Sequence, residues 1–362
     1  MLARARHLLP ILALLPAAPA ATGRAAAAEE PVLEKLAEGV WSMTRPNRPG
    51  DFARANNLII VNDSDVVVVD ANITRADARK VVDVVRRLTP HPVRYVVNTH
   101  WHDDHVLGNR VFADAFPGVE FIAHPATRRD VLGKVAPAAK ENLVEYPRQA
   151  NRLEAQLRGG KRSDGTPLTS SDSARLREFV GVYRNFTEEL RALRLVPPAV
   201  LVERELVLLR GAREIRVMHL GRGNTAGDLV VWLPRERIVA TGDLLVFPIP
   251  YSFGSYLGEW SGTLARVRAL EAAIVMPGHG PIQRDWRYLD QVRELIDTTL
   301  AQVKAGAARG LSLEEVRREL RLEAPRARFL KGDSTLAPAF AQFWIAPASE
   351  RAFAEATGKL DP

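Results

Sequence analysis

Three of the chain's eight histidines fall within six residues, in the segment His100-Trp101-His102-Asp103-Asp104-His105. This segment directly follows residues 93–97, a run that is typical of a buried strand. In a turn that leaves a strand, a tight bend can bring neighbouring side chains round to face one point. Imidazole nitrogens and carboxylate oxygens gathered in this way suit Zn²⁺, at about 2.0–2.2 Å. The segment therefore predicts a metal site at the end of a strand.

Two more residues capable of metal binding follow strand-like runs. Asp243 comes directly after Thr241-Gly242, and His279 lies in the sequence Pro277-Gly278-His279-Gly280. Taken alone, Asp243 could form a turn and His279 could serve a helix cap. Because open α/β sheets collect functional groups beyond the carboxyl ends of their strands, we expect both side chains to join the histidine cluster.

The order of these motifs resembles that of the metallo-β-lactamase-fold hydrolase superfamily. The resemblance covers roughly residues 32–290 and rests on Asp70, the HxHxDH segment at 100–105, the loop at 221–228, Asp243 and Gly278-His279-Gly280. These motifs are specific for the superfamily and say little about the substrate. The resemblance implies an α/β fold, an αββα sandwich with a metal site along one edge.

The resemblance also implies six metal ligands in two sites. The donors would be His100 and His102 in the first site, Asp104, His105 and His279 in the second, and Asp243 as a carboxylate that bridges the two. In the same pattern Asp70 is a buried carboxylate that braces the metal loop and does not bind metal.

One position departs from the family pattern. Asn224 stands where the family usually has a histidine. Because a neutral amide is a poorer donor for Zn²⁺ than imidazole, we expect one tightly bound Zn²⁺ in the second site and a weak or empty first site. His219, five residues earlier, is an alternative donor if its strand points at the site. The single-iron dioxygenases of the family use the histidine that Asn224 replaces, so this chain is not expected to be one of them. The diiron flavoproteins of the family have glutamate at the position of His102, which argues against that group as well.

The expected chemistry follows from the metal. Zn²⁺ lowers the pKa of bound water towards about 7 and polarises a carbonyl, so a metal-bound hydroxide can attack at neutral pH. We expect Asp104 to orient that water or accept its proton, and His100 or His102 to act as general base if the first site is vacant. Asn224 could donate an amide N–H to a developing oxyanion, or it could cap the following turn.

Strands and helices alternate along the chain, which indicates an α/β protein. Strands are predicted at 57–61, 65–70, 93–97, 119–123, 201–209, 214–220, 229–233, 237–241 and 274–276, and helices at 74–88, 260–272, 284–308 and 336–357. Residues 125–197 are rich in Arg, Glu, Ala and Leu and predict a helical insertion, or alternatively a small separate domain. We expect the metallo-β-lactamase-type domain to span 29–290 and a helical C-terminal extension to span 291–362.

Two loops are expected near the metal site. Tyr251 lies in a Pro- and Gly-rich aromatic segment that follows Asp243, and it could line a pocket or simply pack on the surface. Phe52 follows Pro49-Gly50 and could sit on a flap over the site.

The first 28 residues read as an export signal. A short basic segment precedes an apolar run of about 14 residues, too short to span a bilayer comfortably, and Ala25 to Ala28 offer a cleavage site. An uncleaved N-terminal anchor is the alternative. We expect a periplasmic or secreted protein without stable membrane insertion after the signal is removed.

The composition is that of a globular protein, with 26% charged and 46% hydrophobic residues. The absence of cysteine excludes disulfides, thiolate metal sites and a thiol nucleophile. Without residues 1–28 the net charge falls from +7 to +4, and basic residues elsewhere alternate with acidic ones. This pattern argues against a nucleic-acid partner.

The leading hypothesis is therefore an exported, zinc-dependent hydrolase that acts on a small molecule with a lactam, lactone, ester or thioester carbonyl. A true β-lactamase is one alternative, although the subclass that works with a single zinc lacks a different histidine. A non-catalytic, metal-binding member of the fold is the other. The sequence predicts neither the substrate nor the oligomeric state.

Overall fold

The computed structural model describes residues 30–45, 54–162 and 164–360. The predicted export signal at 1–28 and the predicted flap residue Phe52 lie outside these residues. Within the described ranges, no helix is both long and apolar enough to cross a membrane.

The first sheet has seven strands, which follow one another in chain order across the sheet. They are β1 (Val32–Ala37), β2 (Val40–Thr44), β3 (Asn57–Val61), β4 (Val66–Val69), β5 (Val93–Val97), β6 (Glu120–Ala123) and β7 (Val200–Leu201). The first four pair antiparallel, and β4 to β7 pair parallel. All four valines of β4 are fully buried, which fits a central strand covered on both faces.

The second sheet has five strands in the order β12-β11-β10-β9-β8. They are β8 (Glu205–Arg210), β9 (Arg213–Met218), β10 (Val230–Leu233), β11 (Ile238–Ala240) and β12 (Ile274–Met276). The single strand predicted at 201–209 is wrong: residues 200–201 pair with β6 in the first sheet, and residues 205–210 pair with β9 in the second. A bend at residues 203–204 lets the chain pass from one sheet to the other.

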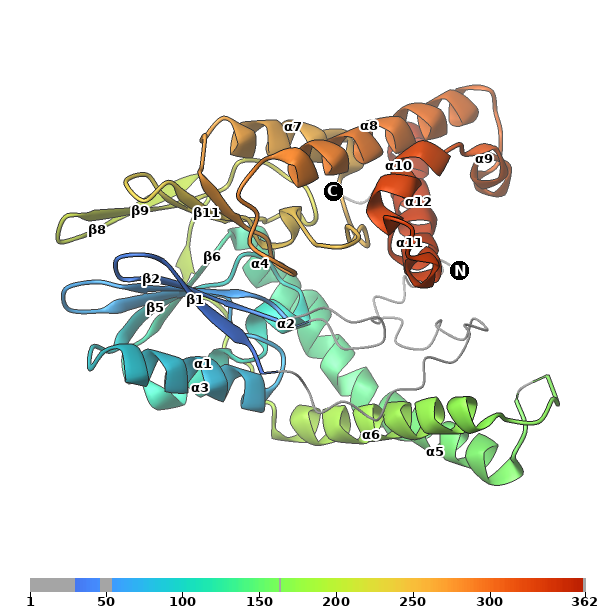
Figure 1. The fold of residues 1–362 in the computed structure, drawn as a ribbon, viewed down its shortest axis with the longest axis horizontal. Coiled ribbons are helices and arrows are strands. Elements are labelled where there is room, and N and C mark those ends of the chain that lie inside the picture. The colour runs from blue at the N-terminus through green and yellow to red at the C-terminus, as the bar shows by residue number, and fades with distance from the viewer. Residues whose placement is uncertain (1–29, 46–53, 163, 361–362) are drawn as a thin grey trace.

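The two sheets pack face to face and carry helices on their outer faces, as Figure 1 shows. Helices α1 (Arg75–Leu88) and α3 (Asn109–Ala115) cover the first sheet, and α7 (Leu257–Arg268) and α8 (Arg287–Ala308) cover the second. Side chains from both sheets, such as Val67 and Val231, form one core between them. This arrangement confirms the predicted αββα sandwich.

A helical insertion separates β6 from β7. It contains α4 (Pro125–Asp130), a π-helical turn at Val131–Val135, α5 (Ala136–Gly159) and α6 (Ser170–Ala192). The long helices α5 and α6 pack against each other around Tyr146, Leu176 and Tyr183. In Figure 1 they project beyond the sheets, towards the lower right of the view. Ile73, which lies between β4 and α1, packs into the same cluster, so the insertion contacts the sandwich.

The chain after β12 is helical. The boundary predicted at 290 falls inside α8, whose buried residues Leu289, Val292 and Leu295 pack on the second sheet with α7. The segments that follow α8 are α9 (Leu313–Glu319), α10 (Glu323–Leu330), a 3₁₀ turn at Ser334–Leu336, α11 (Ala337–Phe340), a π-helical turn at Ala341–Ile345 and α12 (Ala346–Ala356). Trp344 is fully buried and its indole N–H donates to Thr299 Oγ1 of α8, at 3.1 Å.

Candidate metal centre

The histidine cluster lies on the loop that connects β5 to a short helix, α2 (Asp103–Val106). Asn98 holds this loop in a tight turn, because its Nδ2 donates to the backbone carbonyl of His105 at 2.7 Å. Thr99 joins the loop to the second sheet, since its carbonyl accepts a hydrogen bond at 2.8 Å from the N–H of Leu229, the residue before β10. Asp104 and His105 are therefore turned back towards His100.

The donors predicted for the second site are brought together. Nε2 of His279 lies 3.0 Å from Oδ2 of Asp104, and Nε2 of His105 lies 3.5 Å from the same oxygen. Oδ1 of Asp243 lies 3.3 Å from both of these ring nitrogens. Asp104, His105 and His279 thus form one compact group of donors, which Asp243 reaches through the two imidazoles, and all four residues are nearly or fully buried.

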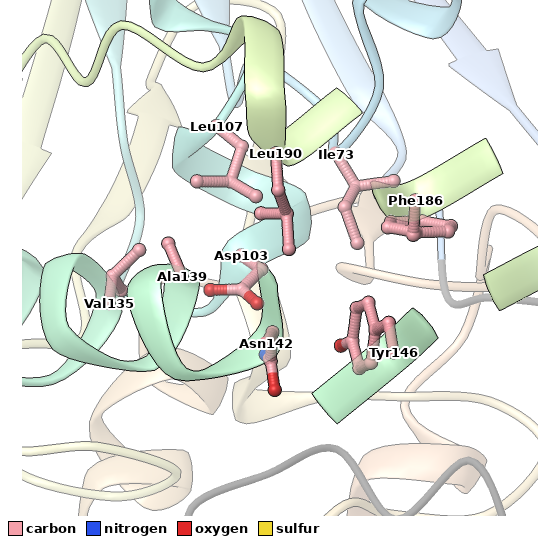
Figure 2. Close-up of a pocket in the computed structure, with 9 residues that line it drawn as sticks. All are labelled: Ile73, Asp103, Leu107, Val135, Ala139, Asn142, Tyr146, Phe186 and Leu190. Carbon is pink, nitrogen blue, oxygen red and sulfur yellow. The ribbon is translucent and has the colours of Figure 1, made fainter. Parts of the chain in front are cut away.

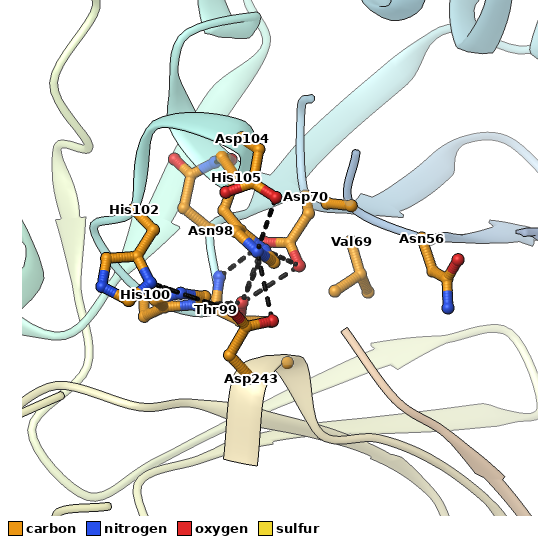
Figure 3. A network of polar contacts seen from close by, with 12 residues as sticks. Asn56, Val69, Asp70, Asn98, Thr99, His100, His102, Asp104, His105 and Asp243 are labelled. Atoms are coloured by element: carbon orange, nitrogen blue, oxygen red, sulfur yellow. Dashed lines mark hydrogen bonds and ion pairs between the residues drawn. The ribbon is translucent and has the colours of Figure 1, made fainter. Parts of the chain in front are cut away.

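The donors predicted for the first site are also adjacent, as Figure 3 shows. Nε2 of His100 lies 2.8 Å from Nδ1 of His102. Oδ2 of Asp243 lies 3.5 Å from the His100 nitrogen and 3.8 Å from the His102 nitrogen. Asp243 thus presents one carboxylate oxygen to each donor set, which is the position expected of a bridging ligand.

Asp70 braces the second set from behind. Its Oδ2 lies 2.8 Å from Nδ1 of His105, and its Oδ1 accepts hydrogen bonds from the backbone N–H of Thr99 at 2.8 Å and from the Thr99 hydroxyl at 3.0 Å. Since a carboxylate only accepts, it favours a proton on Nδ1 of His105 and leaves Nε2 free to face the other donors. This confirms the predicted role of Asp70.

Buried atoms without hydrogen-bond partners show that these residues fit a metal ion. Oδ2 of Asp104, Nε2 of His105 and Oδ1 of Asp243 are buried and make no hydrogen bond within the described part of the chain. Their close polar neighbours are one another and His279, at 3.0–3.5 Å, so without a cation these carboxylates depend on protonated imidazoles. All three belong to the second donor set, so one divalent cation would satisfy them together.

The electrostatics of the centre also favour a cation. Burial opposes protonation of His105 and His279, but the surrounding carboxylates outweigh it, so the pKa of His105 lies well above its usual value and that of His279 is raised to about 9. Burial and the nearby charge of His105 lower the pKa of His100 to about 3, which keeps this imidazole neutral. The metal-free centre therefore holds protons that a divalent cation would displace.

A close approach explains the glycine before His279. A Cβ atom on Gly278 would lie 2.0 Å from Oδ1 of Asp243. Asn56, which the sequence analysis missed, fixes the same loop: its Nδ2 donates to the carbonyls of Pro277 and Gly280 at 3.0 and 2.8 Å. No sequence signal could identify Asn56, because its partners lie more than 220 positions away.

Asn224 is fully buried in the loop between β9 and β10. Its Nδ2 donates to the backbone carbonyl of Tyr251, and its Oδ1 has no hydrogen-bond partner in the described structure. The turn that follows is held instead by Asp228, which accepts from Thr225, so the predicted capping role is wrong. The alternative donor His219 is not supported either, because it stacks on His124 with ring centroids 4.3 Å apart.

Tyr251 contacts the first donor set. Its ring meets that of His102 edge-on, with centroids 5.3 Å apart. Burial, together with Asp104 and Asp243, raises the pKa of the Tyr251 phenol, which therefore stays protonated at neutral pH. The C-terminal extension supports this loop: Phe343 packs against Tyr251, and its carbonyl accepts from the Ser252 hydroxyl at 2.9 Å. The ring contact with His102 favours the alternative in which this loop lines the site over a loop that only packs on the surface.

The helical insertion reaches the opposite side of α2. A small cavity there is lined by Asp103 and by side chains of α5 and α6, as Figure 2 shows. Burial and the neighbouring Asp104 raise the pKa of Asp103 to about 7. Asn142, which faces this cavity from α5, is buried and its Oδ1 makes no hydrogen bond among the described residues. The insertion and the C-terminal extension thus support the metal-binding loops from two directions.

Comparisons with known proteins agree with this geometry. The family model of the metallo-beta-lactamase superfamily matches residues 50–279. A metallo-beta-lactamase type 2 of Bacillus cereus is 32% identical over 257 residues, which cover 69% of this chain and 77% of that protein.

Two further matches are more distant. A linear primary-alkylsulfatase of a Pseudomonas strain is 20% identical over 71% of this chain, and the match spans about half of that protein's length, 48%. The solved structure of a metallo-beta-lactamase from Pontibacter korlensis is 19% identical and superimposes with a TM-score of 0.52, covering 74% of this chain and 99% of that one. The chain belongs to the metallo-beta-lactamase superfamily and is a hydrolase of that family.

Proposed function

We propose that this protein is an exported, zinc-dependent hydrolase that cleaves a small molecule at a lactam, lactone, ester or thioester carbonyl. The observation that carries the proposal is the complete second donor set. Asp104, His105 and His279 bring three donor atoms together, and Oδ1 of Asp243 lies 3.3 Å from both imidazole nitrogens of this group. These side chains would hold the Zn²⁺.

A bound Zn²⁺ supplies an acidified water, with a pKa of about 7, and a Lewis acid for the carbonyl. The protein supplies the remaining functions. Oδ2 of Asp104 faces the donor set, so its other carboxylate oxygen can accept the proton of the attacking water. The pKa of about 3 makes His100 a weak base, so the role of proton acceptor falls to Asp104 in this proposal. Asp70 keeps His105 oriented throughout, because it is buried and already hydrogen-bonded.

Metal content gives the first test. We expect the purified chain to contain one tightly bound Zn²⁺ and to take up a second ion only weakly. A panel of chromogenic lactams, lactones, esters and thioesters should include at least one that is hydrolysed, with activity lost on adding a chelator and restored by Zn²⁺. Asp104→Ala should abolish that hydrolysis. Turnover that survives either the chelator or this substitution would overturn the proposal.

β-Lactam hydrolysis is the subcase with a specific observation in its favour, the match to the Bacillus cereus protein over 77% of its length. A chromogenic cephalosporin tests it directly. Chelator-sensitive hydrolysis of lactones or thioesters, without hydrolysis of the cephalosporin, would restrict the function to the other carbonyl classes.

Export has its own test. Expression of the full chain beside a chain that begins at Glu29 should place only the full chain in the periplasmic or secreted fraction, at a mass reduced by removal of residues 1–28. Retention of the full chain in the cytoplasm would contradict the proposed export.

A further inference from the structure

The orientation of the Asn224 amide is set by its one hydrogen bond. Its Nδ2 donates to the backbone carbonyl of Tyr251. Because a carbonyl only accepts, the amide nitrogen must face Tyr251, and the amide oxygen must face away from it. That oxygen is buried and has no partner in the described part of the chain. The free atom of Asn224 is thus an acceptor, which does not support the predicted role as an N–H donor to an oxyanion.

Two contacts link the Asn224 loop to the first donor set. The carbonyl that it binds belongs to Tyr251, whose ring lies against His102. At the other end of its loop, the N–H of Leu229 donates to the carbonyl of Thr99, the residue directly before His100. Asp228 fixes the loop between these points by accepting from the N–H and the hydroxyl of Thr225, both at 2.8 Å.

We infer that Oδ1 of Asn224 is the fourth donor of the first metal site, beside Nε2 of His100, Nδ1 of His102 and Oδ2 of Asp243. This inference rests on the proposed metal-dependent function. A buried acceptor that lacks any donor is satisfied by a cation, and an amide carbonyl is a normal ligand for hard divalent ions. The first site then has two nitrogen and two oxygen donors. The usual family arrangement, with a histidine in place of Asn224, has three imidazoles and is a softer donor set.

The donor set changes which ion the first site prefers. Carboxylate and carbonyl oxygens suit Mn²⁺ and Mg²⁺, whereas imidazole suits Zn²⁺. Asn224 therefore shifts the preference of the first site away from Zn²⁺ and towards Mn²⁺, while the second site keeps its zinc. Two different metals in the two sites would be the loaded state of this protein.

Three substitutions separate a ligand from a structural asparagine. Asn224→Ala removes both the oxygen and the hydrogen bond to Tyr251. Asn224→Asp supplies a carboxylate oxygen but cannot donate to the Tyr251 carbonyl. Asn224→His supplies the imidazole that is usual in the family. The matched control is Asn62→Ala, a buried asparagine at the turn between β3 and β4, where it contacts Asp65 and Arg213.

The readout is Mn²⁺ binding to the full chain loaded with one equivalent of Zn²⁺, followed by electron paramagnetic resonance. Asn224→Ala should weaken Mn²⁺ binding by about 10–100-fold, the usual cost of disturbing a metal ligand shell. Asn224→Asp should bind Mn²⁺ at least as tightly as the unmodified chain. Asn224→His should take a second Zn²⁺ in preference to Mn²⁺, and Asn62→Ala should match the unmodified chain.

Two results would overturn the inference. One is Mn²⁺ binding unchanged by Asn224→Ala. The other is Asn224→Asp as impaired as Asn224→Ala, which would mean that the hydrogen bond to Tyr251 is all that matters. If Asn224→Ala does not fold, the Asp and His variants decide by their opposite metal preferences. Failure here leaves the tight zinc and the chelator-sensitive hydrolysis in place, whereas failure of the proposed function removes both.

Discussion

Substituting Asp70 by asparagine removes the brace behind His105 while it leaves the shape of the site unchanged. Asp70 is buried, and its carboxylate accepts from Thr99 and lies 2.8 Å from Nδ1 of His105. Its backbone has a φ of 64°, a left-handed conformation that asparagine tolerates well. The substitution therefore changes the hydrogen-bonding chemistry without straining the chain.

The expected loss follows from counting donors. If the new amide turns its oxygen to Thr99, its NH₂ group faces Nδ1–H of His105; if it turns the other way, the NH₂ group faces the N–H of Thr99. In either orientation two N–H donors face each other. In the first orientation, the conflict with His105 is removed only if the ring proton moves from Nδ1 to Nε2, the atom that faces the metal site. Loss of such a supporting contact costs about 10–100-fold in metal affinity, or about 1.4–2.7 kcal/mol.

Competition with a chromophoric chelator measures the Zn²⁺ affinity, and the ¹⁵N shifts of the histidine rings report which nitrogen carries the proton in the zinc-loaded protein. The matched control is Asp65→Asn, a buried aspartate at the turn between β3 and β4 that pairs with Arg210 at 3.0 Å. Its zinc affinity should equal that of the unmodified chain. Unweakened zinc binding in Asp70→Asn, with the His105 ring still protonated at Nδ1, would refute the reasoning.

Three further outcomes are expected. Carboxylates raise the pKa of His279 from 6.5 to about 9 in the metal-free protein. Zinc affinity should therefore rise with pH between these values, and the contribution of the bound proton to the stability of the metal-free protein should fall over the same window. Calorimetry in buffers of different ionisation enthalpy counts the protons that zinc binding releases. Gly278→Ala should lower zinc content by mass spectrometry, since its Cβ would lie 2.0 Å from Oδ1 of Asp243. Trp344→Ala should lower the free energy of unfolding in urea by about 3–5 kcal/mol, because it empties a fully buried site and removes the indole N–H that donates to Thr299 Oγ1.

The sequence predicted which side chains cluster, because these residues lie where strands end. Strand periodicity located β4, β5 and β12, and their carboxyl ends carry Asp70, His100 and His279 in the structure. Parallel pairing brings the ends of β4 and β5 to one edge of the first sheet and those of β11 and β12 to one edge of the second, and the face-to-face packing of the sheets joins the two edges. The assignment of Asp70 as a brace came from the family resemblance, and its hydrogen bonds bear it out.

What could not be predicted depends on contacts between distant segments. Nothing near Asn224 indicates that Tyr251 will bind its amide nitrogen, and this contact decides which atom of the side chain is free. The break between β7 and β8 is likewise invisible locally, because Leu201 and Leu206 are equally suited to a strand and only the two sheets separate them. Phe343 supports Tyr251 from 92 positions further along the chain, which no local pattern reports.

The single carboxylate of Asp243 faces both donor sets, with one oxygen for each. With ions bound in both proposed sites, neither ion could enter or leave without changing the charge and the alignment of a ligand that its neighbour also uses. By thermodynamic reciprocity, whatever the first ion did to the affinity of the second, the second would do equally to the first. Occupancy of the two proposed sites would then be a joint property of the pair, and a change in the supply of one metal would alter how firmly the protein retains the other.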